Sequence, residues 1–105
     1  MRDAAQILRD IAGFQPIGGE WLPLDDLLQE LWDAKPTEEA LPVLFGVFER
    51  FPEDDGAGVL WTIVHGVEHL PFDYETELRE SYARAPSMMA ESMLIRIANA
   101  ARADG

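Results

Sequence analysis

The chain has 105 residues and a formal net charge of −12, from 20 acidic and 8 basic side chains. Phosphate groups are bound by clustered lysine and arginine, so this charge argues against nucleic acid or an anionic membrane as a direct partner. A basic protein is compatible with it, because opposite charges speed encounter. The absence of cysteine excludes disulfides, thiolate metal ligands and cysteine nucleophiles.

No apolar stretch approaches the roughly 20 residues that span a bilayer, and the first residues do not have the pattern of a signal peptide. We therefore expect a cytoplasmic protein with a single domain over residues 1–105.

The first expected helix has Ile7 and Ile11 on its apolar face, Asp3 at its N-cap and Gly13 at its end. A loop marked by proline and glycine follows at 14–22.

Prolines punctuate the next helices. Pro23 suits the start of the second helix, and Pro36 ends it. Thr37 is expected to cap the third, Pro42 to strain its second turn, and Pro52 to end it.

The fourth helix is expected to begin at Asp55, its N-cap, and to end before Pro71, while Pro86 separates the last two. No run alternates like a half-buried strand. The six helices are expected at 3–13, 23–34, 37–52, 55–70, 74–84 and 87–102.

Residues 44–63 recur, in outline, 34 positions later. Seven positions align, and five of the pairs are identical, including Leu44 with Leu78, Arg50 with Arg84 and Ile63 with Ile97. This period predicts stacked helical hairpins. The expected fold is all-α, a HEAT- or TPR-like α-solenoid of three antiparallel hairpins at 3–34, 37–70 and 74–102. Such stacks usually bind macromolecules rather than catalyse reactions.

Acidic residues gather in two stretches without lysine or arginine, at 10–34 and 51–78. The second and fourth helices lie in these stretches, and in a hairpin stack they would be neighbours forming one acidic layer. We predict that the side chains off their leucine stripes, together with the acidic loop at 53–55, bind a partner. The predicted binding residues are Asp25, Asp26, Gln29, Asp33, Glu53, Asp54, Asp55, Trp61, His65, Glu68 and His69.

Each part of this surface has a structural alternative. Trp61 is either an interfacial hot spot or a plug between helices. Likewise, the 53–55 run would favour a helix start through the dipole even without a partner.

The segment 65–69 reads H-x-x-E-H, in which His65 and His69 could hold zinc and Glu68 act as general base. The third ligand would have to be a carboxylate such as Glu91. We treat a small zinc hydrolase as a minor alternative and expect no metal or other cofactor.

The stretches 48–61, 63–68, 84–87 and 93–99 resemble small immunity proteins of bacterial polymorphic toxin and contact-dependent growth inhibition systems. The resemblance covers roughly residues 41–100. It implies a non-enzymatic protein that binds and neutralises a cognate toxin domain, in many such systems a nuclease or another basic domain. The other reading is a helical-repeat adaptor without a toxin partner.

Overall fold

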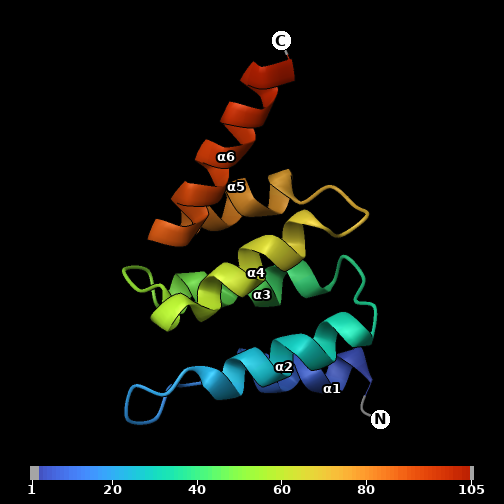
Figure 1. Cartoon of the computed structure of the whole chain (residues 1–105), viewed down its shortest axis with the longest axis vertical. Helices are drawn as coiled ribbons and strands as arrows, with labels where there is room; N and C mark the ends of the chain where they lie inside the picture. The colour runs from blue at the N-terminus through green and yellow to red at the C-terminus, as the bar shows by residue number, and fades with distance from the viewer. Residues whose placement is uncertain (1–2, 105) are drawn as a thin grey trace.

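The computed structural model describes residues 3–104 and is all-α over that range, which confirms the predicted fold class (Figure 1). The helices are α1 (Ala4–Ala12), α2 (Leu22–Asp33), α3 (Ala40–Arg50), the short 3₁₀ helix η1 (Gly56–Gly58), α4 (Val59–Glu68), α5 (Glu75–Arg84) and α6 (Met88–Asp104). None of these helices has the length and the apolar character that crossing a bilayer requires within the described residues.

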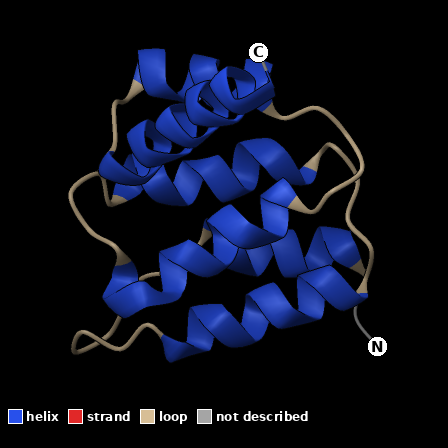
Figure 2. Cartoon of the chain, turned by 45° about the horizontal axis from the view of Figure 1, so that its top comes forward, coloured by secondary structure: helices blue, strands red, loops and turns tan. Residues whose placement is uncertain are grey.

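The helices contact one another in two rows. Helices α1, α3 and α5 form one row and α2, α4 and α6 the other, with contacts within each of the pairs α1–α2, α3–α4 and α5–α6 (Figures 1 and 2). The C-terminal half of α6 rises away from the stack (Figure 1). Helices that follow each other in the chain thus contact each other within these three pairs, and the division of the chain into three hairpins at 3–34, 37–70 and 74–102 stays a prediction. The assignment to a HEAT- or TPR-like solenoid likewise stays a prediction.

The core lies between the two rows and follows the apolar stripes expected from the sequence. Its fully buried large side chains include Ile7, Ile11, Leu24, Leu28, Leu31, Leu41, Leu44, Phe45, Phe48, Leu60, Ile63 and Leu78. In the second copy of the repeat, Leu94 and Ile97 are partly buried and pack against the same core. Burial of these stripes is the main driving force for the stack.

The two repeated arginines have equivalent places in the stack. Arg50, at the end of α3, donates to carbonyl oxygens at the end of α1, including that of Ile11 at 3.0 Å. Arg84, at the end of α5, donates to both carboxylate oxygens of Glu49 on α3, at 3.0 and 2.8 Å. Each therefore ties its helix to the preceding helix of the same row.

The predicted boundaries of α1 are confirmed. Asp3 accepts a hydrogen bond from the Gln6 backbone N–H at 2.9 Å, while the Gln6 side chain accepts from the Asp3 N–H at 3.3 Å. This reciprocal pair is a capping box. Gly13 ends the helix, and its N–H donates to the Arg9 carbonyl at 3.2 Å.

Two predictions about α3 are wrong. The helix begins at Ala40, and Thr37 precedes it in a turn in which its carbonyl accepts from the Ala40 N–H at 3.0 Å. The Ala40 N–H is thus bonded by the Thr37 carbonyl, and no side chain caps the helix as was expected of the Thr37 hydroxyl. Pro42 lies in the first turn, where its missing N–H would have no helical partner, so it does not strain the helix.

The predicted N-cap of α4 is also wrong. Gly56, Ala57 and Gly58 all have positive φ, at 60°, 53° and 91°, so the right-handed α-helix cannot begin before Val59. The cap position is Gly58, and the Asp55 side chain makes no cap hydrogen bond.

Candidate partner-binding surface

Helix α2 presents the acidic side chains that the sequence predicted would face outward. Asp26, Gln29 and Asp33 are exposed. Asp25 is half-buried, and its carboxylate accepts a hydrogen bond from the Thr62 hydroxyl on α4 at 3.2 Å. Asp25 therefore joins the two neighbouring helices as well as adding charge to the surface.

The acidic side chains of α2 have no base within their own helix. The helix contains no lysine or arginine. Asp26 and Asp33 form no side-chain bond with any residue that the structure describes. Arg50, Arg84 and Arg96 are bonded elsewhere, in contacts between other helices.

The acidic loop 53–55 is exposed and lies at the same edge of the stack as the start of α2 (Figure 1). Asp54 accepts a hydrogen bond from the Gly56 N–H at 2.9 Å. Gly56 in turn packs on Trp21, just before α2, so closely that an added Cβ would lie 2.9 Å from the ring carbon Cε3. The 53–55 loop and the acidic start of α2, which are far apart in the sequence, therefore lie near each other.

Helix α4 contributes aromatic and imidazole groups rather than carboxylates. Trp61 is half-buried, and its ring stacks on His65 with centroids 6.0 Å apart and planes at 29°. His65 and His69 are exposed, and Nδ1 of His69 lies 2.7 Å from the His65 carbonyl oxygen. Trp61 therefore packs against the core on one side and remains accessible to a partner on the other.

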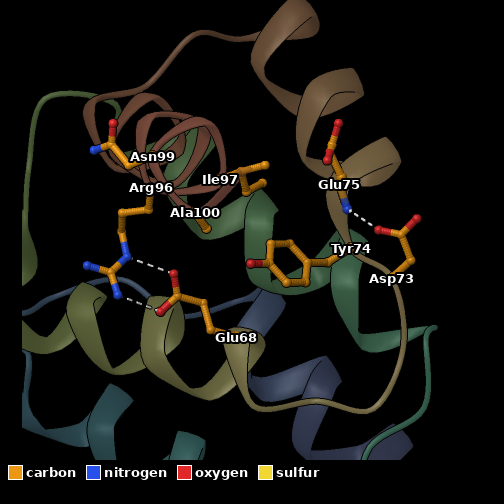
Figure 3. A pocket seen from close by; sticks show the side chains of 8 residues that line it. All are labelled: Glu68, Asp73, Tyr74, Glu75, Arg96, Ile97, Asn99 and Ala100. Carbon is orange, nitrogen blue, oxygen red and sulfur yellow. Dashed lines mark hydrogen bonds and ion pairs between the residues drawn. The ribbon is translucent and has the colours of Figure 1, made fainter. Parts of the chain in front are cut away.

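Glu68 is the one carboxylate of α4, and it is neutralised within the fold. Arg96 of α6 donates to both of its oxygens, at 2.7 and 2.9 Å (Figure 3). These hydrogen bonds from Arg96 lower the pKa of Glu68 below its ordinary value of 4.5. The acidity of the surface is carried by α2 and the 53–55 loop, and α4 adds little to it.

The zinc alternative lacks a third ligand in this geometry. Among residues 3–102, no three histidine or carboxylate side chains come together in a way that could hold a metal ion. Glu91, the suggested third ligand, lines a different hollow beside Pro52 and Tyr82. Glu68, the suggested base, is bonded to Arg96.

An apolar hollow of about 660 Å³ separates the C-terminal ends of α2 and α4. Trp32 and Gly66 both line this hollow, and the Trp32 ring packs directly against Gly66. The sequence did not predict this contact. A Cβ on Gly66 would lie 2.2 Å from a ring carbon of Trp32. Two features of the sequence could have indicated this contact: Trp32 lies off the leucine stripe of its helix, and Gly66 lies within an apolar helix.

A second hollow, of about 590 Å³, lies between α4, α6 and the start of α5 (Figure 3). Tyr74 lines it, and burial is the main cause that raises the pKa of this phenol. Its charged groups are all engaged: Glu68 with Arg96, Asp73 with the Glu75 N–H at 2.9 Å, and Glu75 with an arginine one turn on. Each charged side chain that lines this hollow therefore has a bonded partner within the protein.

The chain has no significant match among protein-family models, curated proteins or solved structures.

Proposed function

We propose that this protein is an immunity protein, which binds a cognate bacterial toxin domain stoichiometrically and neutralises it. The partner is a basic protein domain, such as a nuclease, met in the cytoplasm. In this proposal the protein has no catalytic activity of its own and needs no cofactor.

One observation carries the proposal. Exposed carboxylates at the start of α2, such as Asp26, lie at the same edge of the stack as the 53–55 loop, and Asp26 and Asp33 have no bonded partner within the described residues. Two acids elsewhere join helices instead, since Glu49 is bonded to Arg84 and Glu68 to Arg96. An unneutralised acidic edge gives electrostatic complementarity to a basic surface.

The resemblance to immunity proteins points the same way, because it suggests a toxin as the class of basic partner. Half-buried aromatic groups beside the acidic edge, such as Trp61, fit the usual composition of interface centres. A helical-repeat adaptor would also have stacked helices, but that function does not explain the acidic residues of α2 and the 53–55 loop.

The test is growth protection. We expect the gene just upstream to encode a protein with a toxic C-terminal domain, and this domain is induced with and without this protein in the same cells. We expect growth to be restored by co-expression, and not by an unrelated acidic helical protein of similar size. Failure to restore growth although both proteins accumulate would remove the immunity function.

A further inference from the structure

Two large apolar side chains stand out from the otherwise buried apolar set. Ile17 is 84% exposed and Leu22 is 69% exposed, more than any other large hydrophobic residue in the described chain. Single exposed apolar residues are ordinary. Ile17 and Leu22, however, lie on either side of the buried Trp21 within one short segment. Because both are exposed, neither side chain adds to the hydrophobic core.

A backbone hydrogen bond closes the turn within this segment. Glu20 donates its N–H to the Ile17 carbonyl at 3.1 Å, and Gly18 and Gly19 between them have φ of 62° and 79°. Two successive positive φ values form a tight turn that glycine adopts without strain. The turn thus presents Ile17 at its edge in a fixed conformation.

Buried aromatic rings anchor both ends of the turn. Phe14 and Trp21 are both buried, with ring centroids 5.8 Å apart, and Trp21 also meets Phe51 edge-on at 5.0 Å. A turn whose two ends are held in this way loses little backbone freedom on binding, which favours affinity.

Carboxylates surround the turn. Glu20 is exposed within it, Asp25 and Asp26 follow Leu22 in the first turns of α2, and the 53–55 loop is held nearby by the contact of Gly56 with Trp21. A second copy of this chain would place like charges against each other, which opposes self-association. A basic surface would be attracted instead.

We propose that the 17–22 turn is the apolar anchor of the interface, which inserts Ile17 and Leu22 into an apolar depression on a basic protein domain. The carboxylates form the polar rim, in the usual arrangement of an apolar centre and a charged margin. This inference rests on the proposed function and names the part of the surface that contributes most to affinity.

The test compares two double variants of equal chemistry. Ile17→Ser with Leu22→Ser removes the anchor, while Met88→Ser with Ile95→Ser removes the other exposed large apolar side chains, both on α6. The probe is the purified toxic domain encoded just upstream. We expect the first variant to raise Kd on the order of tenfold or more and the second to change it less than about twofold. Neither should alter the helical circular dichroism.

The outcomes separate the two proposals. If the wild type binds the domain and the Ile17→Ser, Leu22→Ser variant binds equally well, the anchor is wrong and the immunity function stands. If the wild type does not bind, both are overturned. If light scattering shows a wild-type dimer that this variant abolishes, the turn serves self-association, which also contradicts the anchor.

Discussion

At the scale of single residues, the contact between Trp32 and Gly66 decides how closely α2 and α4 approach. Glycine inside a helix is ordinarily about 1 kcal/mol less favourable than alanine. Here the Trp32 ring occupies the place of the missing side chain, with its nearest carbon 2.2 Å from the Cβ position. The local preference for alanine therefore gives way to packing between helices.

We expect Gly66→Ala to lower the free energy of unfolding by about 1–3 kcal/mol, because the ring or the helix must move. Gly46→Ala in α3 is the matched control, since a Cβ there has no atom within 4 Å. It should raise the free energy of unfolding by about 0.5–1 kcal/mol through helix propensity. Urea denaturation measures both, and a Gly66→Ala protein as stable as the wild type would contradict the contact.

At the scale of helices, arginine–glutamate pairs hold successive elements together. Glu49 of α3 accepts two hydrogen bonds from Arg84 and one from the buried Ser81 hydroxyl at 2.7 Å. The Arg84 hydrogen bonds are the main cause that lowers the pKa of Glu49 below its ordinary 4.5. A carboxyl whose folded pKa is lowered contributes stability above its unfolded pKa and loses it as the pH falls through the folded value.

We therefore expect the wild type to exceed Glu49→Gln in free energy of unfolding at pH 7, by a margin that shrinks as the pH falls below about 4.5. The difference between the two proteins is measured because the many other carboxylates also titrate. Glu91→Gln, an exposed site on α6, should show no comparable margin at pH 7. A Glu49→Gln margin that is constant with pH would show that the ionised carboxylate adds no stability.

Much of the helix arrangement could be predicted, and the failures have a common cause. The repeat predicted the order of the helix pairs, and the Asp3 cap was readable because all its partners lie within four residues. The start of α4 was not readable, because Gly56 takes its conformation beside Trp21, far away in sequence. The α2–α4 hollow and the exposure of Ile17 likewise depend on which distant residues meet.

At the scale of the whole molecule, charge is distributed unevenly. Arginines are used in contacts between helices, as Arg50, Arg84 and Arg96 show, while α2 carries only acids among its charged residues. The share of the net charge of −12 that lies on α2 is therefore not offset by a base in the same helix. Such a field speeds encounter with a basic partner and is screened by salt.

We expect Asp26→Lys with Asp33→Lys to slow association with the upstream toxic domain by roughly tenfold at low salt, and less as salt rises. Glu80→Lys with Glu91→Lys makes the same change in net charge on α5 and α6 and should slow it much less. Stopped-flow or surface-binding kinetics measure both. Equal slowing by the two variants would indicate that net charge alone, and not the α2 surface, governs association.

Calorimetric titration of the purified protein into the purified upstream toxic domain tests the central claim most directly. The proposal predicts saturable binding at a 1:1 ratio, with an affinity that weakens as salt is raised. The absence of binding at low salt, with both proteins folded, would contradict it.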